Sequence, residues 1–449
     1  MTELIESPVA QKVADLVPGV IADLKALVAI ESVSADPDRR SEVQRSAEAV
    51  AQLVTDLGCA DVKIVAAGGA PAVIAHFPPP AGQPTVCLYA HHDVQPEGDP
   101  TIWRSDPFVA TERDGRLFGR GAGDDKGGVA VHLAALRAYD GKPPVGVTLF
   151  IEGEEEIGSP TLSALLEAHR DELTADVFVI ADSGNWTVGT PAFTSTLRGL
   201  GEASVEVRTL DHALHSGQFG GVVPDALMVL VRLLASLHDD RGNVAVAGLH
   251  AGVGPELDYP ADRLAAETGI LPGVTYIGDG RVVDRIWAKP SITVLAIDTT
   301  SVAKASNTLI PSARAKVSLR VAPGDDAERA QRRLVEHLQS HAPWGAQVTV
   351  TSGESGQPST IPFAGPYAEA AQTAFAQAWG VEPVQMGQGG SIPMVAEFAA
   401  AFPAATVLVT AVCDPDSRMH GANESLHLGD FAKACTAEAL FLQSLAERA

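Results

Sequence analysis

The sequence is short of basic residues and of cysteine, and each shortage excludes a class of protein. It holds 32 Lys and Arg against 56 Asp and Glu, which gives a formal net charge of −24. Nucleic-acid binding through phosphates needs clustered Lys and Arg, so no nucleic-acid partner is expected. The only cysteines are Cys59, Cys87, Cys413 and Cys435, and none of them forms a CxxC pair. A zinc ribbon or a disulfide scaffold is therefore disfavoured.

Long uninterrupted apolar runs are also lacking. The N-terminal stretch has no basic region followed by a long apolar segment, so no secretion signal is expected. The most membrane-like stretch, residues 395–413, carries Glu397 and is broken by Pro403. It indicates a short buried helix followed by a buried strand rather than a membrane span. These features predict a cytoplasmic protein with no membrane partner.

The chain is long enough for two or three domains. It has 449 residues, of which 46% are hydrophobic and 20% are charged, an ordinary globular balance. Helical periodicity over residues 9–30 and 41–57 precedes apolar strands at 62–65, 73–77 and 86–89, which predicts a layered α/β domain. Pro18 is expected to kink or divide the first helix. Ser159 is expected to cap the helix after the strand at 145–151.

The pattern changes near residue 197. Strands are predicted at 200–208, 291–297, 313–321 and 346–350, with helices at 224–237 and 327–339, and the segment 238–289 has no clear periodicity. This β-α-β-β-α-β order suggests a smaller α+β domain at 197–353, inserted into an α/β domain formed by residues 1–196 and 354–449.

Acidic and imidazole side chains follow several of the predicted core strands. They are His91 and Asp93 after 86–89, Asp124 before the helix that starts near 126, Glu154 to Glu156 after 145–151, Asp182 after 177–181, and His420 in the loop after 406–410. Open α/β sheets bind ligands at the carboxyl ends of their strands. We therefore expect these side chains to meet at one sheet edge.

This set of side chains suits a pair of transition-metal ions. Two imidazoles and three carboxylates favour Zn²⁺, or Mn²⁺ or Co²⁺, over Ca²⁺. Five ligands exceed the three of a mononuclear catalytic zinc site, and a carboxylate shared by two ions would resolve the excess. A paired site can clamp a water nucleophile and polarise a carbonyl, and a further carboxylate can act as general base. Spacing alone does not distinguish the roles of Glu154, Glu155 and Glu156.

Seven motifs in this order resemble the di-zinc metallopeptidase family. They are HHDVQP, GRGAGDDKG, EGEEEIGS, the Asp that ends strand 177–181, LHSGQFGG, GGSIP and HGANE. That family includes carnosinase-type dipeptidases, glutamate carboxypeptidase, aminoacylase and succinyl-diaminopimelate desuccinylase. The stretch 222–249 and the motif GGSIP look most like the dipeptidase branch. The resemblance implies a catalytic domain with a central mixed sheet flanked by helices, plus an inserted α+β domain that acts as lid and dimerisation domain.

The resemblance also implies roles for the ligand-bearing loops. His91 and Asp182 would bind one metal ion, Glu156 and His420 the other, and Asp124 would bridge the two. Glu155 would be the general base and Asp93 the carboxylate that orients a ligand. The triple glutamate is aligned by the IGS that follows it.

In the inserted domain the resemblance points to substrate contacts. His215 of LHSG would cross to the active site of a partner subunit and help to stabilise the oxyanion, with Asn307 or Thr308 nearby. Arg320 would pair with the C-terminal carboxylate of the substrate, and Gly390 and Ser391 would line the substrate pocket. Gln388 departs from the Glu that dipeptidase relatives often carry. The implied assembly is a homodimer through the inserted domain.

The remaining histidines are interpreted as structural or solvated. His92 is expected in the loop beside His91, His76 is expected to be partly exposed, and His212 to be structural or exposed. Polar helix faces are expected to explain His132, His169 and His337, with His341 just past a helix.

The expected function is hydrolysis of the peptide bond of dipeptides or short peptides by a water that two zinc ions activate. One alternative is an amidohydrolase that removes an acyl group from an N-acyl amino acid, which would not require a free α-amine. A more distant alternative is a non-catalytic, metal-stabilised dimeric binding protein, which would be expected to lack a ligand or the base.

Overall fold

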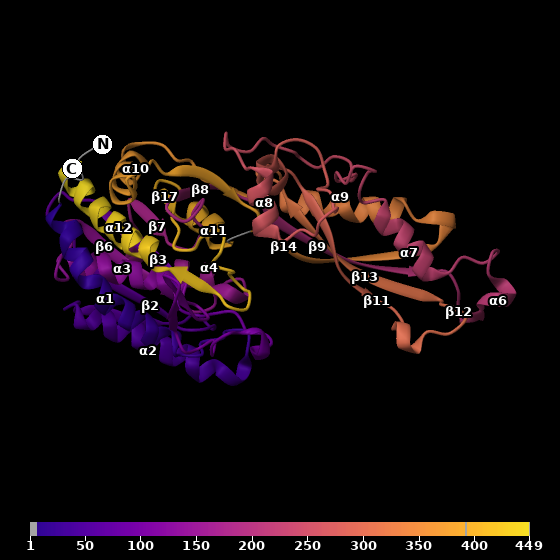
Figure 1. The fold of residues 1–449 in the computed structure, drawn as a ribbon, viewed down its shortest axis with the longest axis horizontal. Coiled ribbons are helices and arrows are strands. Elements are labelled where there is room, and N and C mark those ends of the chain that lie inside the picture. The colour runs from indigo at the N-terminus through magenta and orange to yellow at the C-terminus, as the bar shows by residue number, and fades with distance from the viewer. Residues whose placement is uncertain (1–6, 391–392, 449) are drawn as a thin grey trace. The chain divides into compact units, whose positions relative to one another are not determined.

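The computed structural model describes residues 7–390 and 393–448, and it divides into two compact units. The first unit holds the residues up to Ser195, Ile361–Met386 and the residues from Glu397 onward. The second holds Thr196–Thr360 and the residues from Gly387 to Ala396. The segment 197–353 lies within the second unit (Figure 1), which also holds Gly389 and Gly390 of the GGSIP motif.

A mixed six-stranded sheet forms the centre of the first unit, with the strand order β1-β2-β6-β3-β7-β17. Strands β6, β3, β7 and β17 are parallel, β2 is antiparallel to β6, and β1 is antiparallel to β2. The strands are β1 (Asp61–Val65), β2 (Ala72–Phe77), β3 (Thr85–His91), β6 (Gly146–Glu152), β7 (Val177–Ile180) and β17 (Thr406–Val409). The carboxyl ends of β3, β6 and β7 therefore lie side by side, as the strand-loop pattern predicts.

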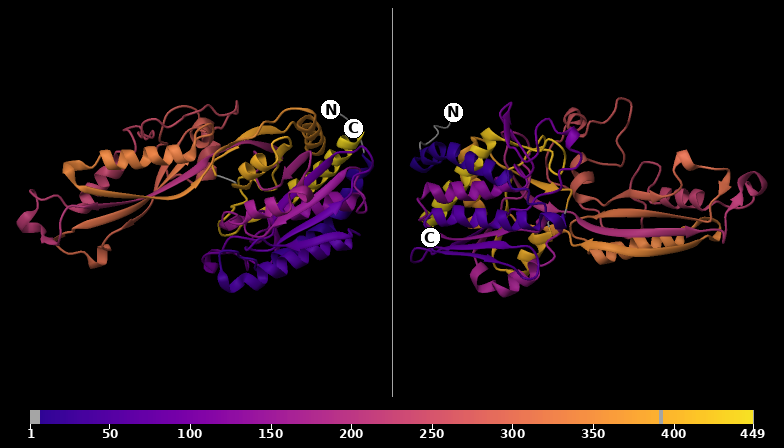
Figure 2. Two further views of the ribbon diagram at one scale, coloured as in Figure 1. Left: turned by 180° about the vertical axis from the view of Figure 1, so that it is seen from behind. Right: turned by 90° about the horizontal axis from the view of Figure 1, so that it is seen from below.

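Helices cover both faces of this sheet (Figure 2). Val86, Leu88 and Ala90 of β3 share one buried core with helices of the N- and C-terminal parts of the chain. These helices are α1 (Pro8–Val28), α2 (Arg40–Asp56), α3 (Lys126–Ala138), α10 (Pro366–Trp379) and α12 (Leu428–Arg448). On the opposite face, Tyr89 packs edge-on against Phe398 of α11 (Pro393–Ala401). Side chains alternate along a strand, so β3 is buried on both sides.

Several shorter elements remain, of which β15 belongs to the second unit, and β8 and β16 each have residues in both units. Two small sheets have the strand orders β18-β5-β4 and β15-β8-β16. Their strands are β4 (Thr111–Arg113), β5 (Arg116–Phe118), β18 (Ser425–His427), β8 (Ala192–Leu197), β15 (Ser359–Thr360) and β16 (Val384–Gln388). The last two short helices are α4 (Leu162–Ala168) and α5 (Arg170–Leu173). Strand β18 pairs with β5, and so holds the chain that follows His420 beside the chain that precedes Asp124.

The second unit is an antiparallel four-stranded sheet with helices α7 and α9 packed on one face (Figure 1). Its strand order is β11-β13-β9-β14. The elements are β9 (Gly199–Arg208), α7 (Ala226–Ala235), β11 (Ser291–Asp298), β13 (Ser312–Val321), α9 (Ala327–Ser340) and β14 (Gln347–Gly356). Their order along the chain is the predicted β-α-β-β-α-β. Shorter pieces are β10 (Leu214–His215), α6 (Ser216–Phe219), α8 (Ala261–Thr268) and β12 (Thr308–Leu309).

One local prediction is wrong, and one of the two alternatives predicted for Pro18 is excluded. Ser159 does not cap a helix, because it takes a left-handed backbone conformation with φ 52° and α4 begins only at Leu162, after Thr161. Pro18 does not divide the first helix, since α1 runs without interruption from Pro8 to Val28. Burial of Val13, Val20 and Leu24 in the core stabilises this helix, and tertiary packing of this kind supplies most helical stability in proteins.

The apolar stretch at residues 395–413 forms α11 and then β17, which confirms a helix followed by a strand. Its charged residue, Glu397, accepts a hydrogen bond of 2.8 Å from the Ser163 hydroxyl. Within residues 7–390 and 393–448, no helix combines the length and the apolar character needed to cross a membrane.

Candidate metal centre

The centre is built on the carboxyl end of β3. His91 is the last residue of this strand and pairs in register with Glu152, the last residue of the parallel strand β6. Its ring is fully buried, with Nδ1 3.1 Å from the carbonyl oxygen of Asp93 and 3.3 Å from Oδ1 of that residue. These contacts fix the ring so that Nε2 faces the centre.

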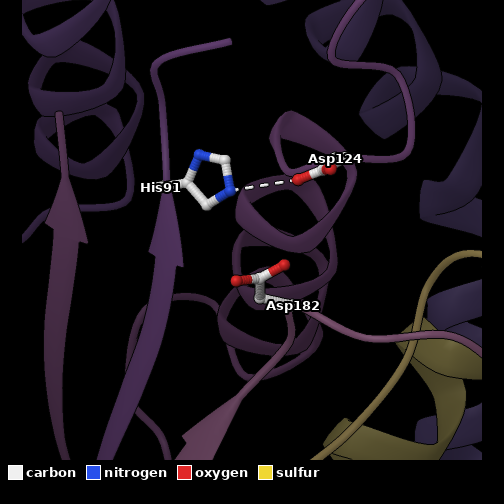
Figure 3. Close-up of side chains that lie close together, drawn as sticks. All are labelled: His91, Asp124 and Asp182. Atoms are coloured by element: carbon white, nitrogen blue, oxygen red, sulfur yellow. Dashed lines mark hydrogen bonds and ion pairs between the residues drawn. The ribbon is translucent and has the colours of Figure 1, made fainter. Parts of the chain in front are cut away.

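Asp124 lies at the middle of the centre. It precedes α3, whose N-cap is Asp125. Oδ1 of Asp124 is 3.1 Å from Nε2 of His91 (Figure 3), and Oδ2 is 3.0 Å from Nε2 of His420. The two oxygens of one carboxylate therefore face two different imidazoles.

Two overlapping groups of side chains could each hold a cation. His91, Asp124 and Asp182 form one group, and Asp124, Glu156 and His420 form the other. Within each group the potential ligand atoms all lie within 4.8 Å of one another. The five residues come from five separate segments of the chain, and the structure brings all of them together, with Asp124 common to both groups. Figure 3 shows the group formed by His91, Asp124 and Asp182.

The three consecutive glutamates have different surroundings. The carboxylate of Glu154 points away from the centre and accepts hydrogen bonds from the amides of Ala70 (2.9 Å) and Thr161 (2.7 Å). Glu156 lies 3.3 Å from Nε2 of His420. Glu155 lies between these two environments in sequence, with Oε2 3.9 Å from Nε2 of His91. The structure thus gives each of the three glutamates distinct surroundings, which their spacing in the sequence does not reveal.

Asp93 and Gln95 hold the glutamates in place. The carboxylate of Asp93 accepts hydrogen bonds from the backbone amides of Glu155 (3.2 Å) and Glu156 (3.1 Å), besides its contact with His91. Gln95 donates from its backbone amide (3.1 Å) and from Nε2 (2.7 Å) to the two carboxylate oxygens of Glu156. One loop after β3 therefore positions the glutamates after β6.

The charges at the centre fit divalent cations. The pKa of Glu155 is raised to about 8, chiefly by burial and then by the carboxylates of Glu156 and Asp124, against the opposing effect of His91. Burial, followed by the charge of Glu155, also raises the pKa of Asp182. Hydrogen bonds to Asp124 and Glu156 raise the pKa of His420 to about 10. Protons on these groups neutralise part of the crowded negative charge, and bound cations could neutralise it instead.

The predicted substrate residues lie in the second unit. His215 is exposed and forms the short strand β10, which pairs with β12 so that His215 is opposite Thr308. The backbone amide of Ser216 donates to the carbonyl of Asn307 (3.0 Å). Arg320 is half-buried on β13, opposite Ser291 and Leu200.

The GGSIP loop is only partly described. Gly390 is exposed, and a Cβ atom added to it would meet no atom within 4 Å. Ser391 lies outside the described residues. The backbone carbonyl of Gln388 accepts a hydrogen bond of 3.3 Å from the amide of Arg198.

Several residues that position the centre were not predicted from the sequence. Gln95 stands inside the quoted motif HHDVQP, Arg120 inside GRGAGDDKG and Glu424 inside HGANE, and their neighbours received roles while they did not. Arg120 and Glu424 are both buried and form an ion pair of 2.5 Å. The available signal was a polar or charged residue within a motif that also carries a predicted ligand.

The predictions for the other histidines are confirmed at some positions and wrong at others. His212 is exposed, His76 is partly exposed and His92 lies in the loop after β3, as predicted. The polar-face explanation is wrong for His132 and His337, which are both buried. Nδ1 of His132 lies 2.8 Å from Glu438, and Nε2 of His337 lies 3.0 Å from the hydroxyl of the half-buried Ser236, so each ring has a protein partner. His169 is half-buried where α4 meets α5, and His341 directly follows α9.

Comparison with known proteins establishes the family. The model of peptidase family M20/M25/M40 matches residues 87–444. The chain is 33% identical over 430 residues to a cysteinylglycine-S-conjugate dipeptidase of Corynebacterium striatum, an alignment that covers 94% of each protein. It is 29% identical over 458 residues to the human Beta-Ala-His dipeptidase, covering 95% of this chain and 90% of that protein.

Solved structures agree with the sequence relatives. The di-peptidase Dug1p from Saccharomyces cerevisiae superimposes with a TM-score of 0.82 at 25% identity, with 99% of each chain covered. Human carnosine dipeptidase 1 superimposes with a TM-score of 0.80 at 26% identity, covering 98% of this chain and 99% of that one. The chain therefore belongs to peptidase family M20/M25/M40 and is a hydrolase that acts on peptide bonds. The predicted fold class is confirmed, and the family implies divalent metal ions.

Proposed function

We propose that this protein is a dipeptidase that hydrolyses dipeptides and short peptides with two bound divalent metal ions, Zn²⁺ in the native enzyme. The observation that carries the proposal is the position of Asp124, whose two oxygens each face a different imidazole. A carboxylate placed in this way can be shared by two ions. The relatives named as dipeptidases of cysteinylglycine conjugates and of Beta-Ala-His support the substrate class.

The proposed ligand sets follow the two groups of side chains. His91 and Asp182 hold one ion, Glu156 and His420 hold the other, and Asp124 belongs to both. Ions bound there would supply Lewis acidity toward the attacking water and the scissile carbonyl. Asp93 keeps the ring of His91 in position and ties the backbone of the glutamates to β3.

Glu155 is the proposed general base. Its Oε2 lies 3.9 Å from Nε2 of His91, a member of the first ligand group. Unlike Glu154, whose oxygens are occupied by the amides of Ala70 and Thr161, it has a carboxylate oriented toward the centre. In the reaction its Oε2 takes a proton from the attacking water and then gives that proton to the leaving amine.

The second unit would recognise the substrate and complete the site. Arg320 would pair with the C-terminal carboxylate, and a guanidinium fits this group bidentately. His215, with Asn307 and Thr308 beside it, would reach the active site of a partner subunit in a homodimer and stabilise the oxyanion. Gly390 and Ser391 would line the substrate pocket.

A substrate panel on reloaded protein tests the proposal. Metal-stripped protein is reloaded separately with Zn²⁺, Mn²⁺ and Co²⁺ and assayed on Ala-Ala, Cys-Gly, β-Ala-His and N-acetyl-alanine. We expect no turnover without metal and, after reloading, faster hydrolysis of the dipeptides than of N-acetyl-alanine. A strong preference for N-acetyl-alanine would instead favour an amidohydrolase. Absence of turnover on every compound, with both ions bound, would favour a non-catalytic binding protein.

A further inference from the structure

A buried ion pair beside the centre contacts the backbone of Asp124, the residue after His420 and the residue after Gln95, whose side chain in turn binds Glu156. Glu424, at 0% exposure, and Arg120, at 1%, are joined by a hydrogen bond of 2.5 Å from Nη1 to Oε2. Neither residue belongs to the two ligand groups. The contacts of this pair with three loops around the centre indicate a positioning role.

Glu424 holds the loop that carries Asp124. Its Oε1 accepts hydrogen bonds from three backbone amides, those of Gly121, Gly123 and Asp124, each at 3.1 Å. Gly121 has φ +81°, a conformation that favours glycine, and an added Cβ at Gly123 would lie 2.5 Å from Sγ of Cys413. The loop is therefore wrapped closely around this one carboxylate, which fixes the backbone of Asp124.

Arg120 holds the two other loops. Its Nη2 donates to the carbonyl of Gly421, the residue after His420, and to the carbonyl of Pro96, the residue after Gln95, both at 3.2 Å. Gln95 in turn grips the carboxylate of Glu156 through two hydrogen bonds. His420 itself is 58% exposed in its side chain and has φ 61°, so its own packing does little to hold it.

Arg120 and Glu424 contact one of the two ligand groups more extensively than the other. Glu424 binds the backbone amide of Asp124, and Arg120 binds the residue after His420. Arg120 also binds the residue after Gln95, whose side chain binds Glu156. Of the other group, only the shared Asp124 is contacted directly, whereas His91 is held by Asp93. Outer partners of metal ligands commonly change metal affinity about 10–100-fold when they are mutated.

We propose that Arg120 and Glu424 are positioning residues that assemble the metal position formed by Asp124, Glu156 and His420. The inference rests on the proposed two-ion function. Loss of the pair lets the three loops separate, so the affinity for one of the two ions falls at least tenfold, while the ion held by His91 and Asp182 stays close to its wild-type affinity. A purely structural pair would lower stability without this selectivity.

The test is a titration of metal-stripped Glu424→Gln with Co²⁺. Calorimetry and the visible absorption of the bound ion both monitor the titration. The matched control is Glu438→Gln, which removes a carboxylate from another buried ion pair, with His132, that contacts none of the ligands. We expect the wild type and the control to bind two Co²⁺ ions tightly. Glu424→Gln should bind one ion with wild-type affinity and the other with lower affinity. If Glu424→Gln does not fold, Arg120→Lys, which keeps a positive charge but lacks the forked donors, should show the same selective weakening.

The outcomes separate this inference from the proposed function. If the folded variants bind both ions with wild-type affinity, or if both affinities fall equally, the positioning role is overturned. The proposed two-ion dipeptidase function would not be affected by either result. A wild-type protein that binds fewer than two ions would overturn both. Hydrolysis of Ala-Ala by the wild type at two bound ions, measured in parallel, identifies which of these cases holds.

Discussion

At the scale of single residues, neighbours in sequence have unrelated tasks. Glu154, Glu155 and Glu156 follow the same strand, yet the first is bound by backbone amides, the second faces the buried centre and the third is gripped by Gln95. The turn after β6 rotates each side chain in a different direction. A substitution at each position should therefore produce a different loss.

Glu154→Ala is expected to destabilise the protein without removing a metal ion. The variant leaves the amides of Ala70 and Thr161 without their acceptor, and unsatisfied buried groups typically cost about 1–3 kcal/mol each. Urea unfolding should show the lower free energy of unfolding, and metal analysis should still find the wild-type ion content. Loss of an ion from Glu154→Ala would mean that the three glutamates are assigned one position out of register.

At the scale of elements, α3 connects the centre to the core behind it. Its first turn follows Asp124, and further along its length His132 is fully buried between α12 and β3. Nδ1 of His132 lies 2.8 Å from Glu438, and Nε2 lies 2.9 Å from the carbonyl oxygen of Tyr89. Both ring nitrogens face acceptors, which favours the protonated ring.

This arrangement predicts a pH dependence of stability. Burial lowers the pKa of His132, but Glu438 and the carbonyl of Tyr89 outweigh it, so the folded pKa lies above the unfolded value of about 6.5. The stabilisation is complete below pH 6.5 and is lost as the pH rises through the folded pKa, with a slope of at most about 1.4 kcal/mol per pH unit. Urea unfolding of metal-stripped protein over a pH series should show this decline, and Glu438→Gln should lack it. Identical pH profiles for the two proteins would contradict the account.

The sequence predicts the elements better than their connections. The strands and the ligand-bearing loops follow from apolar runs and from the polar residues that end them, so His91, Asp182 and His420 could be placed at one edge. Ser159 could not be read correctly, because its left-handed backbone depends on how the turn after β6 packs. Nor could Arg120 and Glu424 be paired, since they are about 300 positions apart and only the fold brings them together.

At the scale of the whole molecule, the residues proposed for catalysis are divided between two units. The proposed metal ligands belong to the first unit, and His215 and Arg320 belong to the second. In the proposed homodimer each active site uses Glu155 from one chain and His215 from the other. This division makes complementation between two inactive variants possible.

Mixed dimers of His215→Ala and Glu155→Ala should therefore regain activity. Each variant alone is expected to be nearly inactive, while a purified mixed dimer contains one intact site and should show about half of the wild-type turnover. Differently tagged chains, expressed together and purified through both tags, would supply the mixed dimer for assay on Ala-Ala. Verified mixed dimers that stay inactive would contradict sharing of the site between subunits.

The central claim is that a two-ion centre works with Glu155 as its base. The most direct measurement takes Glu155→Gln and the wild type through metal analysis and an Ala-Ala assay in the same samples. The account predicts two ions per chain in both proteins and a turnover reduced about 10²–10⁴-fold in the variant, the usual contribution of a general base. Turnover near the wild-type rate, or loss of ions from Glu155→Gln, would contradict it.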